Sequence, residues 1–222
     1  MNFSEEWDKI YAEGQQVSVW PWSDLVTYVM RHSKSMEFPF DVLELGCGAG
    51  ANIPFFKTLG MGYFALEGSQ TIVNQLHRRY PEYKDTILMA DFTDNIPFEK
   101  KFDLVVDRAS LTHNTTDAIK RCLNMIKSHL NIGGAFIGID WFSKQHSEFE
   151  YGVFENDGNT KSKFPNGQFK DVGRTHFSDK DHIIELFEGF EITKLEHKII
   201  TQEIPFGNYK FASLNFVAIN KV

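Results

Sequence analysis

Short apolar runs alternate along this chain with segments in which apolar residues recur every three or four positions. After residue 40 the apolar runs are Val42–Leu45, Tyr63–Leu66, Thr86–Met89, Phe102–Val106 and Ala135–Ile139. Between consecutive runs lie segments with the period of an amphipathic helix. This alternation is typical of a parallel sheet with helices on both of its faces.

Capping residues indicate where several of the helices begin. Ser69 can cap one helix, and either Thr115 or Thr116 can cap another. Ser178 and Asp181 have the spacing of a capping box, with Asp in place of the usual Glu. The helices expected from these signals and from periodicity span about residues 7–11, 23–30, 52–59, 70–80, 116–130 and 179–189.

Two late apolar runs, Phe190–Ile200 and Phe211–Ile219, are joined by a turn-forming segment at 203–208. They predict an antiparallel pair of strands at the end of the chain. The predicted fold class is therefore α/β: a Rossmann-like, seven-stranded mixed sheet with helices on both faces and an antiparallel terminal strand pair.

The 222 residues are expected to form one domain, with residues 1–36 as an N-terminal helical cap. Residues 143–177 break the alternation, because they are rich in Gly, Asn, Lys and Phe and show no clear period. So long an irregular connection in a compact domain is usually a lid or a binding loop. We therefore interpret residues 143–177 as a lid or substrate-binding insertion.

Polar and glycine residues follow the first three strands at the positions where each strand ends. In open α/β sheets the ligand lies beyond the carboxyl ends of the strands, so these residues form the candidate site. A glycine turn lets the backbone approach a ligand, and carboxylates accept hydrogen bonds from ribose hydroxyls or an adenine amino group. The residues are Gly46, Gly48 and Gly50 after the first strand, Glu67 after the second, and Asp91 with Phe92 after the third. This pattern fits both NAD and S-adenosylmethionine (SAM), because both contain adenosine.

Several segments together resemble the class I SAM-dependent methyltransferases of the small-molecule type. Asp41–Gly50 resembles their first motif, Ala65–Glu67 their acidic ribose motif and Met89–Phe92 their adenine motif. Phe102–Asp107, Ile132–Ala135 and the N-terminal Trp7–Tyr11 also resemble family segments. The resemblance covers about residues 1–141 and, more loosely, the last 45, but not residues 143–177.

The resemblance implies SAM as cofactor, S-adenosylhomocysteine (SAH) as product and a small molecule as methyl acceptor. It places the glycines near the methionine and ribose parts of the cofactor, Glu67 on the ribose, and Asp91 with Phe92 on the adenine. It also implies cofactor contacts for a further set of residues: Glu44, Gly68, Asp107, Arg108, Trp7 and Tyr11.

The acceptor side is predicted from residues after the fourth and fifth strands. His113 is the candidate base, since a histidine accepts a proton near neutral pH; packing under the cofactor or helix capping is the alternative. Candidates for contact with the acceptor are Trp20, Trp22, Asp140, Trp141 and Arg174. His146, His176, Lys170 and the aromatic residues Phe154, Phe164 and Phe169 are further possibilities in the insertion.

Charge and composition narrow the partners. A net charge of −7 without a dense basic patch disfavours nucleic acid as substrate. No apolar run approaches the roughly 20 residues that span a bilayer, and the start lacks the features of a signal peptide, so we expect a cytoplasmic protein without a membrane partner. Two cysteines and no metal-ligand spacing predict neither a disulfide framework nor a metal site.

Two alternatives remain open on this sequence: a nicotinamide-dependent oxidoreductase, and a SAM-binding module without catalytic activity. The sequence determines neither the acceptor nor the oligomeric state.

Overall fold

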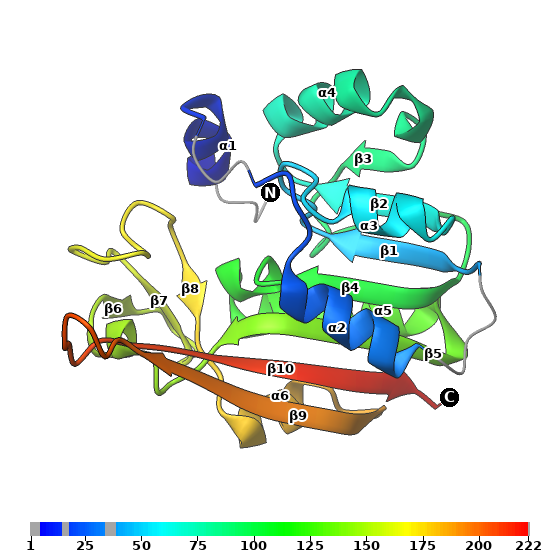
Figure 1. Ribbon diagram of the computed structural model, residues 1–222. Coiled ribbons are helices and arrows are strands. Elements are labelled where there is room, and N and C mark those ends of the chain that lie inside the picture. Colours follow the sequence, from blue (N-terminus) through cyan, green and yellow to red (C-terminus); the bar gives the residue numbers. More distant parts are fainter. Residues whose placement is uncertain (1–4, 15–17, 34–38, 222) are drawn as a thin grey trace.

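A central sheet of seven strands organises the computed structural model, which describes residues 5–14, 18–33 and 39–221 (Figure 1). The strands are β1 (Asp41–Leu45), β2 (Gly62–Glu67), β3 (Ile87–Met89), β4 (Phe102–Arg108), β5 (Leu130–Phe142), β9 (Phe190–Thr201) and β10 (Lys210–Asn220). Their order is β3-β2-β1-β4-β5-β10-β9, with β10 antiparallel to both β5 and β9 and the other pairs parallel. The predicted fold class is confirmed.

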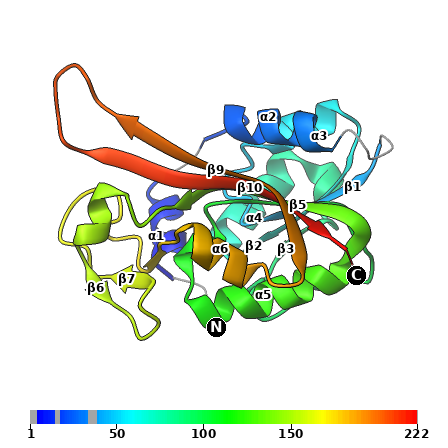
Figure 2. The ribbon, with the colours of Figure 1, turned by 90° about the horizontal axis from the view of Figure 1, so that it is seen from below.

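Helices cover both faces of this sheet (Figure 2). The helices are α1 (Glu5–Ala12), α2 (Ser23–His32), α3 (Ile53–Thr58), α4 (Gln70–Arg79), α5 (Thr116–His129) and α6 (Lys180–Leu186), with short 3-10 turns η1 (Pro81–Tyr83), η2 (Leu111–His113) and η3 (Ser147–Glu150). Side chains from α2, α3 and α4 join one core cluster, and those from α5 and α6 join another. Neighbours such as Val42 and Leu43 belong to opposite clusters, because successive strand residues point to opposite faces.

The helix starts follow the capping signals with one correction. Ser69 caps α4 by accepting a hydrogen bond from the Ile72 N–H, and Thr115, not Thr116, caps α5. The α6 cap is Asp179, which accepts from the His182 N–H, so the predicted box at Ser178 and Asp181 is wrong by one residue. The backbone of Ser178 instead forms a bridge with the segment after β5.

The insertion contains strands that the sequence pattern did not reveal. β6 (Val153–Phe154), β7 (Thr160–Ser162) and β8 (Thr175–His176) form a small antiparallel sheet of their own. Strands of two or three residues are too short to show an alternating pattern, so the expectation of an irregular segment is corrected. Five buried residues form the core of this unit: Phe142, Phe164, Phe169, Val172 and Phe177.

Both α1 and the small β6–β8 sheet lie at the end of the central sheet where its parallel strands end (Figure 1). Of the expected N-terminal cap, residues 1–36, the parts 1–4, 15–17 and 34–36 lie outside the described residues. Among the helices described, none combines the length and the apolar character needed to cross a membrane.

Candidate active site

A cavity of about 350 Å³ lies at the carboxyl ends of β1, β2 and β4. β1 lies between β2 and β4, and the strand order reverses beside it. The helices α3 and α4, which connect the strands on one side of β1, pack on the opposite face from α5, which follows β4. Thirteen of the residues considered from sequence line this cavity: Trp7, Tyr11, Trp22, Glu44, Gly46, Gly48, Glu67, Asp91, Phe92, Arg108, His113, Asp140 and Phe169. The structure therefore brings together residues that lie far apart in the chain.

The turn after β1 requires glycine at its first position. Gly46 has φ +61°, and a Cβ there would lie 2.3 Å from the Cβ of Ser110. The absent side chain lets the turn pack against the loop after β4. Gly50 serves a different purpose, because a Cβ there would meet Ile53 and Leu76 at 2.7 Å, and it does not line the cavity.

Glu67 is buried at the end of β2 and is fixed by the glycine turn. Its carboxylate accepts hydrogen bonds from the N–H groups of Gly48 at 2.8 Å and Ser69 at 3.0 Å. Burial raises the pKa of Glu67, and these backbone donors act in the opposite direction. A carboxylate has about four lone-pair sites, so it retains capacity for further donors such as ribose hydroxyls. The neighbouring Gly68 does not line the cavity.

The end of β3 is held by a local turn. One oxygen of Asp91 accepts from both the N–H and the hydroxyl of Thr93, at 3.0 and 2.6 Å. Phe92 is buried in the core cluster beside α5 and also lines the cavity. This arrangement presents an acidic side chain next to an aromatic ring, the chemistry expected for an adenine site.

Helix α1 is fastened over the site by a residue whose role the sequence did not reveal. The carboxylate of Asp8 accepts hydrogen bonds from the hydroxyls of Ser69 and Thr71 at the start of α4, and this pairing lowers the pKa of Asp8. The α1 side chains Trp7 and Tyr11 consequently line the cavity. Asp8 lies within the segment that resembles the family helix, which is the signal that could have found it.

Glu44 connects the floor of the cavity to α2. It accepts from the Asn52 side-chain amide at 2.7 Å and from the Tyr63 hydroxyl at 2.6 Å, and Asn52 in turn accepts from the Trp22 N–H at 3.3 Å. Burial raises the pKa of Glu44 to about 7, against the effect of its two donors.

Asp107 does not reach the cavity, and the expectation that it contacts the cofactor is corrected. It is fully buried and accepts from the Leu111 N–H at 3.0 Å, the Ser110 hydroxyl and the Trp141 indole N–H at 2.7 Å. It thus shapes the loop after β4. Burial raises the pKa of Asp107 to about 6.

Trp141 is also corrected, because its side chain is buried among Phe136, Phe187 and Phe216 and not directed to an acceptor. β5 continues to Phe142, so Trp141 falls on the strand face that packs against α5 and α6. Trp20 is three-quarters exposed and does not line the cavity either.

His113 lies between aromatic rings and is tied to the insertion. Its ring centroid is 4.8 Å from that of Trp7 and 6.0 Å from that of Phe142. Nδ1 lies 2.8 Å from the backbone oxygen of Arg174. A carbonyl oxygen only accepts, so Nδ1 carries the proton and Nε2 has the free lone pair. Burial lowers the pKa of His113 to about 4, which leaves the ring neutral at pH 7.

Arg174 thus contributes its backbone, and its side chain is not among the groups lining the cavity, which corrects the expected acceptor contact. The insertion lines the cavity through Gln168, Phe169 and Val172. Of the other insertion residues considered from sequence, Lys170 and Phe154 are exposed, and His146, Phe164 and His176 are buried outside the lining. Over the ranges the structure describes, no group of three or more His, Cys, Asp or Glu side chains is arranged to hold a metal ion.

Comparison with known proteins agrees with this geometry. Residues 42–134, which run from β1 through α5 to Gly134 in β5, match the family model described as a methyltransferase domain. The match covers 93 of the 222 residues, counted from 42 to 134, and it indicates a methyltransferase domain in this part of the chain. A search of curated proteins finds no match to the sequence.

Solved structures share the methyltransferase fold at low sequence identity. A SAM-dependent methyltransferase from Methanosarcina mazei is 14% identical with a TM-score of 0.67, over 90% of this chain and 98% of that one. The 1,6-didemethyltoxoflavin-N1-methyltransferase of Burkholderia thailandensis, solved with 1,6-didemethyltoxoflavin and SAH, is 18% identical with a TM-score of 0.67, over 98% of this chain and 87% of that one. A SAM-dependent methyltransferase from Clostridium acetobutylicum is 14% identical with a TM-score of 0.64, over 98% and 97% of the two chains.

Proposed function

We propose that this methyltransferase-family chain binds SAM and transfers its methyl group to a small-molecule acceptor. The observation that carries the proposal is the convergence of the glycine turn at Gly46 and Gly48 with Glu67 and Asp91 around one cavity. Glycine amides and two separated carboxylates are the groups that an adenosine with two ribose hydroxyls and an amino group requires.

The chemistry of these residues fits SAM. The cavity lining contains the acidic side chains Glu44, Glu67, Asp91 and Asp140, a suitable environment for a cofactor with a positive sulfonium. The glycine turn packs closely against the loop after β4, because a side chain at Gly46 would collide with Ser110. Trp7 and Tyr11 from α1 would then exclude water from the methionine end.

When bound, SAM supplies an electrophilic methyl group with a neutral sulfide as leaving group, so position and electrostatics are the protein's share of the work. In our proposal, the nucleophilic atom of the acceptor loses its proton to Nε2 of His113. The Arg174 carbonyl supports this step, because it holds Nδ1–H and accommodates the positive charge that develops on the ring. Burial lowers the pKa of His113 to about 4, so at pH 7 the ring is neutral and acts as a weak base.

The nicotinamide alternative is weaker, since residues 42–134 match a methyltransferase model and the sheet ends in the antiparallel β10–β9 pair. The module without activity remains the second candidate. The free Nε2 of His113 within the described cavity lining argues for catalysis, because a pure binding module has no use for a base at this place.

The test is methyl transfer from labelled SAM into an extract of small metabolites, followed by mass spectrometry of labelled products. We expect a labelled product with the wild-type protein and with Asp94→Ala, an exposed residue of the same turn. Asp91→Ala should lose at least about tenfold in activity at low SAM concentration, the effect of removing one charge-assisted hydrogen bond. SAM binding without any labelled product would instead favour the binding module.

A further inference from the structure

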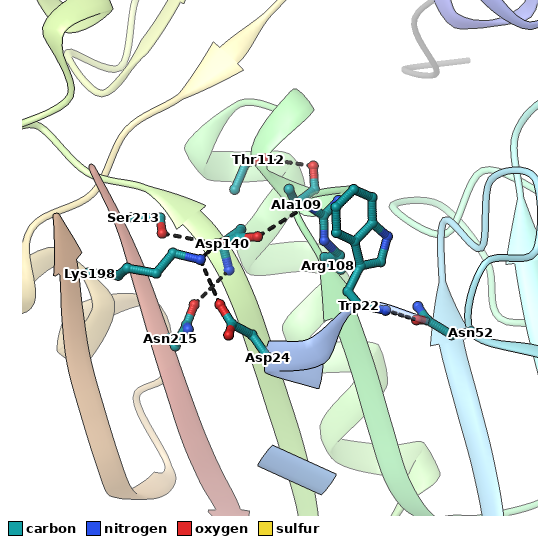
Figure 3. Close-up of polar contacts among 10 residues, drawn as sticks. All are labelled: Trp22, Asp24, Asn52, Arg108, Ala109, Thr112, Asp140, Lys198, Ser213 and Asn215. Carbon is teal, nitrogen blue, oxygen red and sulfur yellow. Dashed lines mark hydrogen bonds and ion pairs between the residues drawn. The ribbon is translucent and has the colours of Figure 1, made fainter. Parts of the chain in front are cut away.

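Arg108, at the end of β4, places a guanidinium in the cavity wall with most of its donors unused by the described residues. One terminal nitrogen donates to Asp140 at 3.1 Å, and the guanidinium carbon lies 3.5 Å from the centre of the Trp22 ring (Figure 3). Its Nε is buried and has no hydrogen-bond partner within the described chain. A guanidinium carries five N–H donors, and those on the terminal nitrogens are the ones within reach of a ligand, because Nε is buried.

Asp140 does not neutralise Arg108 by itself, because another cation shares its carboxylate. Lys198 from β9 donates to Asp140 at 2.5 Å and to Asp24 at 2.6 Å, and Ser213 adds a third donor to Asp140 at 3.1 Å (Figure 3). Two cations, Arg108 and Lys198, therefore share the two carboxylates of Asp140 and Asp24, and Arg108 uses one donor in this cluster.

The backbone at Asp140 is arranged to make this contact. Asp140 has φ +56°, and its N–H donates to the side-chain oxygen of Asn215 where the pairing of β5 with β10 shifts register. A bulge of this kind redirects a side chain, and bulges are frequent beside active sites. The result is an arginine whose plane is fixed by Trp22 on its face and by Asp140 at its edge.

The acceptor side of the cavity carries several apolar side chains beside the polar Gln168 and His113. Phe142, Phe169, Val172 and Phe211 line the same cavity, and they come from β5, from the insertion and from β10. Among the cavity-lining residues described, Arg108 is the one permanent cation. Glu44, Glu67 and Asp91 are acidic residues of the cofactor side, and the acidic Asp140 is paired with Arg108 itself. An anionic group on the acceptor is therefore attracted to Arg108 and repelled by Glu44, Glu67 and Asp91.

We propose that Arg108 anchors a carboxylate on the acceptor, and that the acceptor is an apolar, ring-containing small molecule bearing that carboxylate. This inference rests on the proposed methyl transfer and names its substrate class. The planar fork of arginine matches the two oxygens of a carboxylate, and an ammonium does not reproduce that fit. The carboxylate is the anchor and not the methylated atom, because a carboxylate nucleophile has no proton for His113 to remove.

The test uses 4-hydroxybenzoate and 4-hydroxybenzamide as matched probes, titrated by NMR into the SAH-loaded protein. We expect the carboxylate to bind at least about tenfold more tightly than the amide, the discrimination typical of a hydrogen-bonded charge pair. Arg108→Met should remove this preference, Arg108→Lys should retain only part of it, and inorganic phosphate should not compete at equal concentration. Arg121→Met, an exposed residue of α5, is the control and should behave as the wild type.

Equal affinity for the two wild-type probes, tight binding of phosphate, or the same loss in Arg121→Met would overturn the inference. The wild-type probe ratio remains decisive even if Arg108→Met fails to fold. SAH binding is measured first for each protein, so the two proposals fail separately. SAH binding without carboxylate preference removes the substrate class alone, whereas no SAH binding by the wild type removes the proposed function.

Discussion

At the scale of the residue, hydrogen bonds within the protein determine which side-chain atoms of the site remain available to a ligand. His113 shows this most clearly, since its bond to the Arg174 carbonyl fixes the proton on Nδ1 and leaves Nε2 as the acceptor. Glu67 follows the same logic, because Gly48 and Ser69 orient a carboxylate that retains lone pairs for a ligand. Neither statement is available from residue type alone.

The protonation state of His113 gives a direct prediction at this scale. Burial lowers its pKa to about 4, so the ring stays neutral above that pH and becomes charged only below it. We expect ¹⁵N NMR of the ring to show the Nδ1–H tautomer without change from pH 8 to pH 5. The ring signal of the exposed His197 in β9 serves as the internal comparison. Protonation of His113 near pH 6.5, or a proton on Nε2, would contradict the proposed base.

Sequence reasoning succeeded where a residue's position at a strand end determines its surroundings. Gly46, Glu67 and Asp91 follow parallel strands, and parallel strands end at one edge of the sheet. It failed where the outcome depends on packing. Whether Trp141 faces the core or the cavity depends on how far β5 continues, and no pattern in the sequence marks that length.

At the scale of the element, two attachments hold the walls of the cavity. Asp8 fastens α1 to α4, as described above, and η3 fastens the insertion. The buried carboxylate of Glu148 in η3 accepts from the Gln168 and Phe169 N–H groups at 2.9 and 3.1 Å and from the Tyr209 hydroxyl at 2.9 Å. The Glu148 carboxylate therefore ties the cavity-lining segment at Gln168 and Phe169 to the start of the insertion and to Tyr209, which precedes β10.

Replacing Glu148 should loosen that segment. Glu148→Gln puts an amide NH₂ where a buried donor needs an acceptor, and we expect the free energy of unfolding to fall by about 1–3 kcal/mol. Amide hydrogen exchange at Gln168 and Phe169 should become faster. Glu150→Gln, an exposed residue of the same turn, is the matched control for both measurements. Indistinguishable exchange in the two variants would show that Glu148 does not hold the cavity wall.

The insertion also shows why the elements were only partly predictable. Its three strands have two or three residues each, and its core consists of aromatic residues spread from Phe142 to Phe177. A periodic signal needs a longer run than these strands provide. The strands of the main sheet are mostly longer, and β1, β2, β4, β5 and β10 are largely buried, so their apolar runs were recognisable.

At the scale of the whole molecule, the fold brings three parts of the chain to one cavity. The methyltransferase domain match at residues 42–134 supplies the cofactor side, while α1 and the insertion supply walls that the match does not include. The edge strand β9 also contributes to the cavity wall, because its Lys198 pairs with Asp140, which lines the cavity. We propose that residues 143–177 and the N-terminal helices adapt a common cofactor-binding sheet to a particular acceptor.

Calorimetric titration with SAH and with NAD tests the central claim, that the glycine turn and two carboxylates converge on one adenosine. We predict that each chain binds one SAH and gives no heat with NAD, and that Glu67→Gln weakens SAH binding at least about tenfold, as expected for one lost charge-assisted acceptor. Binding of NAD, or unchanged SAH affinity in Glu67→Gln, would contradict the account.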